Sequence, residues 1–130
     1  MAITKMKAVF QNDIKDVWNM VTSLDNYQWR SDISKIEVIS ENQFVEYTKD
    51  GYQTTFTITA TTPLERWEFD MENSNMTGHW TGLFSTENGN TEIEFTEEVT
   101  AKKLMMKPFV KAYLKRQQRQ YVMDLRNALG

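Results

Sequence analysis

The only histidine of the chain, His79, is the first residue to consider for acid–base or metal chemistry. It alternates with Trp80 in a predicted strand, so its side chain should lie on the solvated face of a sheet. With no cysteine in the chain, a zinc site would have to surround this one histidine with carboxylates. No serine or acid pattern completes a Ser-His-Asp triad, and the five glycines form no phosphate-binding loop. We therefore predict no catalytic residue, no metal ion and no cofactor.

Three polar residues fall on faces that are otherwise apolar. In a predicted strand, Glu97 falls on the same side as the apolar residues two positions before and after it. Gln117 and Asp124 lie on the apolar face of a C-terminal helix. A buried carboxylate is costly unless it is paired or protonated. Either Glu97 sits near a frayed strand end and Asp124 pairs with Arg30 or Arg66, or both acids bind a ligand's polar head or move a proton. Gln117 suits a ligand hydroxyl or carbonyl, or a buried water.

The element that positions two of these groups is a long helix predicted from Pro108 to Ala128. It contains no glycine, and its only proline falls in the first turn, where a missing N–H does no harm. At about 1.5 Å per residue it is roughly 30 Å long. Its exposed face carries Lys111, Lys115, Arg119 and Arg126, and its buried face carries Val110, Tyr113, Leu114, Gln117, Tyr121, Asp124, Leu125 and Ala128. Because several side chains of the buried face end in polar groups, we predict that this helix covers a cavity.

The N-terminal part of the chain predicts one strand followed by short helices. The strand covers Ile3–Phe10, and apolar residues at helical spacing predict a helix over Asp13–Ser23 with Asn12 as its N-cap. The aromatic-rich segment Leu24–Ser31 is either a turn or a second short helix.

Six further strands are predicted after these helices. The first two cover Ile33–Ile39 and Phe44–Lys49, and Asp50-Gly51 then predicts a hairpin. The last four alternate apolar and polar residues around Phe56, Trp67, Trp80 and Phe95 and are joined by short turns, which indicates antiparallel pairing with one solvated face. Two inward glycines in the sixth of the seven strands, Gly78 and Gly82, either bend the sheet or leave room for Trp80 and Phe84.

Composition bounds the class of protein. A chain of 130 residues predicts a single domain, 1–130, large enough to fold without disulfides. A net charge of −3 argues against nucleic acid as a partner. No signal peptide or membrane-spanning run is visible, so we expect a cytoplasmic protein that is a monomer or weak dimer without stable membrane insertion. The basic C-terminal quarter is either a solvated helix face or a surface for an anionic membrane or partner.

The order of these elements, together with several segments, resembles the START-related SRPBCC superfamily. The segments that carry the resemblance are Ile14–Trp18 with Leu24–Trp29, Trp67–Phe69, Gly78–Gly82 leading to Thr91–Phe95, and Tyr113 to Leu125. Within the superfamily the chain is similar to small bacterial proteins of the polyketide cyclase/dehydrase or lipid-transport type. The resemblance implies an α+β helix-grip fold, in which a curved seven-stranded antiparallel sheet wraps a long C-terminal helix, with two short helices between strands 1 and 2. It also implies a deep cavity for apolar or amphipathic molecules such as lipids, polyketides or aromatic compounds.

Three functions are compatible with this pattern. The first is a carrier or sensor that binds a small hydrophobic or amphipathic molecule, the second a cyclase/dehydrase-type enzyme that uses an inward acid, and the third a protein-interaction domain with a filled interior. The predicted ligand-binding residues are Trp29, Phe56, Trp67, Trp80, Phe84, Glu97, Tyr113, Gln117 and Tyr121.

Overall fold

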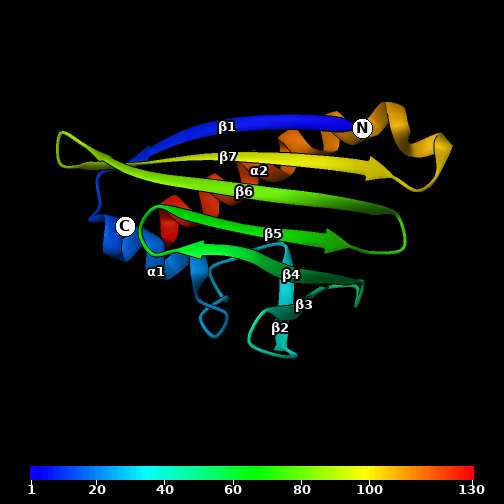
Figure 1. The fold of residues 1–130 in the computed structure, drawn as a ribbon, viewed down its shortest axis with the longest axis horizontal. Coiled ribbons are helices and arrows are strands. Elements are labelled where there is room, and N and C mark those ends of the chain that lie inside the picture. The colour runs from blue at the N-terminus through cyan, green and yellow to red at the C-terminus, as the bar shows by residue number, and fades with distance from the viewer.

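The computed structural model describes residues 1–130, which form one curved sheet with a long helix across one face (Figure 1). The elements are β1 (Ala2–Phe10), α1 (Ile14–Thr22), β2 (Ile33–Val38), β3 (Gln43–Thr48), β4 (Gln53–Thr62), β5 (Arg66–Glu72), β6 (Met76–Glu87), β7 (Asn90–Ala101), a single 3₁₀ turn η1 (Leu104–Met106) and α2 (Lys107–Leu129). The prediction of a seven-stranded antiparallel sheet followed by one long helix is confirmed.

The seven strands pair antiparallel in the order β1-β7-β6-β5-β4-β3-β2. Six of them therefore form a continuous meander, and only β1 lies beside a strand distant in sequence. The hairpin predicted at Asp50-Gly51 is present, with Gly51 at a φ of +84°. The β6–β7 turn places Asn88 and Gly89 at positive φ as well, which suits a tight hairpin.

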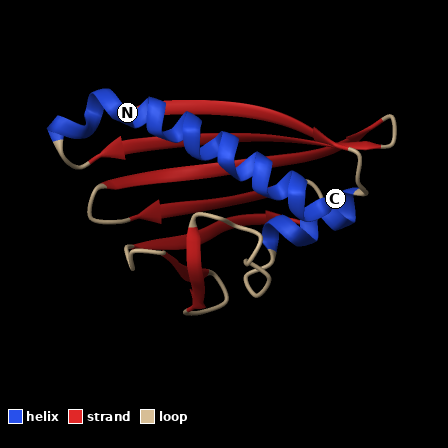
Figure 2. Cartoon of the chain, turned by 180° about the vertical axis from the view of Figure 1, so that it is seen from behind, coloured by secondary structure: helices blue, strands red, loops and turns tan.

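Helix α2 crosses the apolar face of the sheet diagonally (Figure 2) and packs mainly on β1 and β7. Near its start, Val110 and Leu114 join Val99 and Ala101 in a small buried cluster. Near its end, Leu125 is fully buried in the main core, together with Phe10, Val17 and Phe95. Because the helix lies over one side of the sheet, the inner face of β3, β4 and β5 has no helix packed directly against it.

The region between β1 and β2 differs from the prediction in two details. The N-cap of α1 is Asp13, whose Oδ1 accepts a hydrogen bond from the backbone N–H of Lys15 at 2.8 Å. Asn12 instead donates from Nδ2 to the last carbonyl of α2, Leu129 O, at 3.2 Å. The segment Leu24–Ser31 forms turns, so only one short helix lies between β1 and β2 and the expected second helix is absent.

The two inward glycines do not coincide with the irregularities of the sheet. Register shifts occur in β2, between Ile33 and Lys35, and in β4, between Ile58 and Ala60. A methyl group at Gly82 would overlap the ring of Trp80, so this glycine makes room for the indole. Gly78 allows a close approach to β7, because a Cβ there would lie 2.8 Å from the carbonyl oxygen of Glu98.

None of the helices combines the length and apolar character needed to cross a bilayer.

Candidate ligand-binding site

A cavity of about 1030 Å³ lies between α2 and the inner faces of β3 to β7, and it is lined mainly by apolar side chains. Its exposed lining residues come from two places. Asp50 belongs to the β3–β4 turn, whereas Met105, Phe109 and Tyr113 belong to η1 and the start of α2. The cavity therefore opens to solvent between that turn and the N-terminal end of the helix.

Aromatic rings form a continuous wall across the sheet side of the cavity. Phe44 stacks on Phe56 with centroids 4.9 Å apart, and Phe69 stacks on Trp80 at the same distance. Phe69 contacts Phe56 edge-on at 5.1 Å, which joins the two pairs, and it contacts Trp67 edge-on at 5.3 Å. Strand alternation aims all of these side chains inward, since the rings on one strand are two residues apart. The wall suits a flat or chain-like apolar ligand body.

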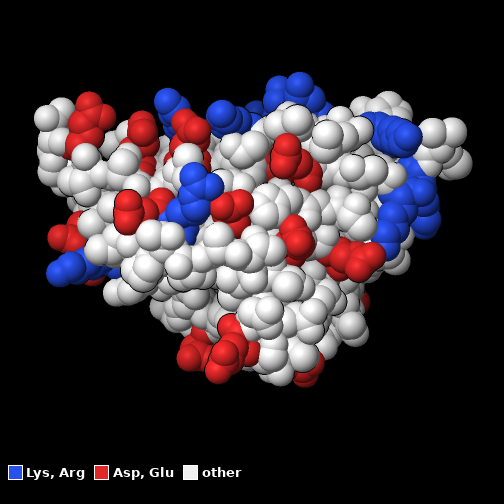
Figure 3. Space-filling model, viewed as in Figure 1, with Lys and Arg blue, Asp and Glu red and all other residues white.

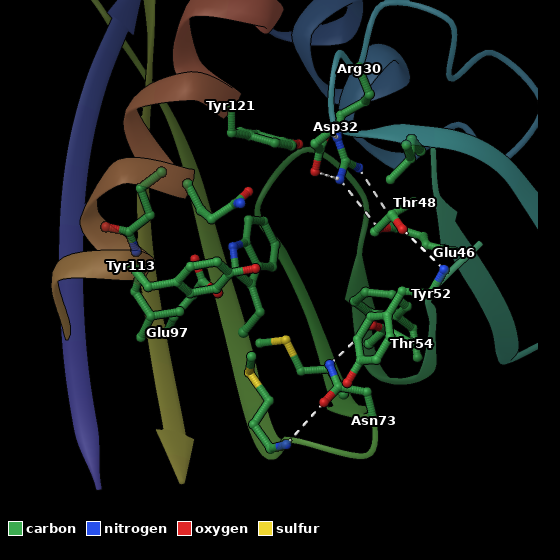
Figure 4. Close-up of a pocket in the computed structure, with 18 of the residues that line it drawn as sticks. Arg30, Asp32, Glu46, Thr48, Tyr52, Thr54, Asn73, Glu97, Tyr113 and Tyr121 are labelled. Atoms are coloured by element: carbon green, nitrogen blue, oxygen red, sulfur yellow. Dashed lines mark hydrogen bonds and ion pairs between the residues drawn. The ribbon is translucent and has the colours of Figure 1, made fainter. Parts of the chain in front are cut away.

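The helix side of the cavity carries polar groups, and Glu97 of β7 is the acid among them (Figure 4). Burial raises the pKa of Glu97 to about 7, although the nearby Gln118 amide and the charge of Arg30 oppose the shift. Glu97 pairs with Thr4 on one side and Trp80 on the other, in the middle of the β1–β7–β6 ladder. The alternative of a frayed strand end is therefore wrong, and the carboxyl group lines the cavity.

Across the cavity, Arg30 forms a compact ion-pair cluster with two acids (Figure 4). Its guanidinium donates to Asp32 from Nε at 3.0 Å and from Nη2 at 2.9 Å, and to Glu46 from Nη1 and Nη2 at 3.2 Å. Burial alone would lower the pKa of Arg30, but Glu46 and Asp32 outweigh it and raise that pKa. The guanidinium also lies 5.3 Å from the centroid of the Tyr121 ring.

Asp124 has a structural role, but its partner differs from the prediction. Its Oδ2 accepts hydrogen bonds from the backbone N–H of Ser31 at 2.9 Å and from the Ser31 hydroxyl at 2.7 Å. Its Oδ1 accepts from Gln120 Nε2 at 2.9 Å. Arg30 and Arg66 both pair elsewhere, so neither predicted ion pair with Asp124 forms. Asp124 ties α2 to the loop before β2 and does not line the cavity.

Eight of the nine predicted ligand-binding residues line this cavity. They are Trp29, Phe56, Trp67, Trp80, Glu97, Tyr113, Gln117 and Tyr121. The exception is Phe84, which lies beyond the end of the cavity and packs edge-on against Trp18 of α1 at 4.9 Å. It shares the inward parity of Trp80, but α1 covers that end of the sheet. We therefore remove Phe84 from the proposed set.

The prediction missed several lining residues, and a sequence signal existed for some of them. Glu46 shares strand parity with Phe44, which marks it as inward. Gln118 follows Leu114 at helical spacing and is buried, whereas Gln117 is only half-buried. Arg30 carries no such signal, because it lies in a loop whose path is set by distant contacts.

His79 lies on the outer face of the sheet, as predicted. Its Nδ1 lies 2.7 Å from Asp70 and its Nε2 lies 2.8 Å from Glu68. Desolvation lowers the pKa of His79, but the hydrogen bonds and charges of these two acids outweigh it and raise that pKa. Figure 3 shows this outer face, where acidic side chains are spread among uncharged ones.

Comparisons with known proteins find the same architecture in several solved structures. No family model and no curated protein matches the sequence. A START superfamily protein from Mycobacterium smegmatis superposes with a TM-score of 0.86 at 10% identity, over 98% of this chain and 96% of that one. A conserved protein from Geobacillus kaustophilus gives a TM-score of 0.84 at 9% identity, over 98% of this chain and 95% of that one.

A further similar structure is DynU16, a protein in the dynemicin biosynthetic locus, with a TM-score of 0.80 at 12% identity. That alignment covers 98% of this chain and 46% of DynU16, so this chain spans about half of its length. At these identities the likeness concerns the fold. The sheet order and the long C-terminal helix show that this chain has a helix-grip fold, which it shares with the START superfamily protein from Mycobacterium smegmatis.

Proposed function

We propose that this protein binds a small hydrophobic or amphipathic molecule in the cavity between the sheet and α2, as a carrier or sensor. The observation that carries the proposal is the cavity itself, about 1030 Å³ with an aromatic wall and a mouth to solvent. Most domains of this size have close-packed interiors, so a hollow this large indicates a site for a guest molecule. The similarity to a START superfamily protein and to DynU16 supports the same conclusion.

A titration with the uncharged solvatochromic dye Nile red tests this proposal, with native mass spectrometry of the purified protein to detect a bound molecule. Met71 lines the cavity, so Met71→Trp should place an indole inside it and weaken dye binding at least about tenfold. Glu72→Trp is the matched control, because Glu72 is exposed on the same strand. Equal dye binding by both variants would show that the dye does not occupy this cavity.

Glu97 supports a second candidate, a cyclase/dehydrase-type enzyme that moves a proton within the cavity. An acid with a pKa of about 7 can both give and take a proton at neutral pH, which suits general acid–base catalysis. Glu97→Gln distinguishes the two functions once a ligand is known. An enzyme should lose turnover by far more than it loses substrate affinity, and a carrier has no turnover to lose.

The third candidate, a protein-interaction domain with a filled interior, is the least supported. The cavity is open, although exposed apolar residues do occur at η1 and early α2, where Met105 is 86% and Phe109 is 70% exposed. Because Met105 and Phe109 line the cavity mouth, they serve ligand entry in the binding proposal.

A further inference from the structure

We propose that the cavity selects its ligand by headgroup charge, so that it takes a protonated amine on an apolar body, held at Glu97, and rejects carboxylates. This inference rests on the proposed binding function and names the ligand class. It follows from three features of the cavity: the state of its buried arginine, the isolation of its inward acid, and the aromatic wall between them.

The buried arginine is not available to bind an anionic ligand. Four hydrogen bonds from Arg30 go to the carboxylates of Asp32 and Glu46. Because two acids face one guanidinium, this cluster carries a net negative charge. The other basic residue that lines the cavity, Arg116, is exposed at the mouth, where solvent weakens its attraction. A ligand carboxylate in the interior would thus meet negative charge and no free cation.

Glu97 is in the opposite situation, because no ion pair reaches its carboxyl group. The groups of helix α2 that act on or beside it are the neutral Tyr113, Gln118 and Tyr121, whereas the charge of Arg116 at the cavity mouth acts on Tyr113. The one charged group that acts on it is Arg30, which the two acids already neutralise. Its cross-strand neighbour Thr4 has a buried hydroxyl without a hydrogen-bond partner. Glu97 therefore lacks an ion-pair partner of its own, and a ligand ammonium would supply one.

The aromatic wall favours the same charge. Ring faces carry negative potential and attract cations, and Trp80 is both the cross-strand partner of Glu97 and part of that wall. A ligand whose ammonium approaches Glu97 would pass over these rings while its apolar body fills the space beside Phe44 and Phe56. The raised pKa of Glu97 is the expected property of a buried acid that has no ion-pair partner in the protein.

Three probes with the same twelve-carbon chain test the inference: dodecylamine, dodecan-1-ol and dodecanoic acid, each displacing Nile red from the full chain at pH 8. At this pH Glu97 is mostly ionised and the amine is still protonated. We expect the amine to bind at least about tenfold more tightly than the acid, with the alcohol between them. Glu97→Gln should weaken amine binding about tenfold and change alcohol binding less than about threefold. Glu98→Gln is the matched control, because Glu98 is exposed on the opposite face of β7.

The outcomes separate this inference from the function on which it rests. If dodecanoic acid binds the wild type as tightly as dodecylamine, or if the two variants lose amine affinity equally, charge selection at Glu97 is wrong while cavity binding stands. If neither the dye nor any of the three probes binds, the proposed function fails and this inference fails with it. Circular dichroism of both variants checks that the fold is intact, and an alcohol affinity of Glu97→Gln within about threefold of the wild type separates loss of charge selection from loss of the cavity.

Discussion

At the scale of single residues, two charged groups inside the cavity have opposite environments. Arg30 pairs its single positive charge with two carboxylates, whereas Glu97 has no counter-ion. The fold provides the partners of Arg30 from the segment before β2 and from β3, whereas the neighbours of Glu97 on α2 are all uncharged. This difference makes Arg30 part of the scaffold and leaves Glu97 available to a ligand.

The raised pKa of Glu97 predicts a specific pH dependence of stability. Its ordinary pKa is 4.5 and its pKa in the folded protein is about 7, so the folded state binds the proton more tightly. The free energy of unfolding should therefore fall as pH rises from about 4.5 to about 7. Glu97→Gln lacks this loss, so its stability relative to the wild type should increase between pH 4 and pH 8, by at most about 3 kcal/mol.

Urea unfolding of both proteins across this pH range measures the effect. His79 also has a raised pKa, and stability from its ion pairs is likewise lost as pH rises through that value. The difference between Glu97→Gln and the wild type cancels this contribution, because both proteins keep His79. A difference that does not change with pH would contradict the burial of Glu97.

Arg30→Ala should destabilise the protein by about 2–3 kcal/mol, because it leaves Asp32 and Glu46 facing each other without a cation. The matched control is Arg66→Ala, which removes the more exposed pair with Glu68 and should cost less than about 1 kcal/mol. Chemical denaturation of the two variants gives both values. Equal losses would mean that the Arg30 cluster is as solvated as a surface ion pair.

At the scale of elements, the cavity depends on how α2 is held at its two ends. Asn12 caps its last carbonyl, and Asp124 joins its final turns to Ser31 in the loop before β2. At the other end, Val110 and Leu114 pack on β7. The helix is thus fixed over one side of the sheet, and the loop that carries Trp29 and Arg30 closes the inner end of the cavity without filling it.

Asp124→Ala should release this loop and cost about 1–2 kcal/mol at neutral pH. Burial raises the pKa of Asp124, but its hydrogen bonds from Ser31 and Gln120 outweigh that effect and lower the pKa below its ordinary 3.8. Its contribution is therefore present above that value and is lost as pH falls through the lowered pKa. Hydrogen exchange should speed up over residues 24–32 in the variant. Asp25→Asn, an exposed change in the same loop, should leave exchange unaltered.

At the scale of the whole molecule, the cavity lowers the stability of the folded protein, and a bound ligand would raise it. The cavity-lining rings of β3 to β6 contact one another and leave the centre open, so contacts are missing on their inner side. Any molecule that fills this space and has no affinity for the unfolded chain must raise the melting temperature.

Dodecan-1-ol at about 100 times its dissociation constant should stabilise the protein by about 2.7 kcal/mol, which raises Tm by roughly 8–10 °C. Calorimetry with and without the alcohol measures the shift. Met71→Trp fills part of the cavity and should show a smaller shift, whereas Glu72→Trp should match the wild type. An unchanged Tm in the wild type would contradict binding to the folded state.

The sequence alone determined those features of this protein that depend on local periodicity. Alternation of apolar and polar residues predicted the strands and the inward direction of Trp67, Trp80 and Glu97. Helical spacing predicted α2. These patterns are local, because the direction of a side chain on a strand or helix follows from its position in a short repeat. For the same reason, eight of the nine predicted ligand-binding residues line one cavity.

Only the tertiary structure decided which inward residues meet each other. Ser31 and Asp124 are 93 residues apart, and Arg30 and Glu46 are 16 apart, so no short repeat relates them. Packing of α1 removed Phe84 from the cavity, and the exact rotation of α2 buried Gln118 more deeply than Gln117. The presence of a hollow also required the fold, since the same aromatic residues could have filled it had α2 lain closer to β4 and β5.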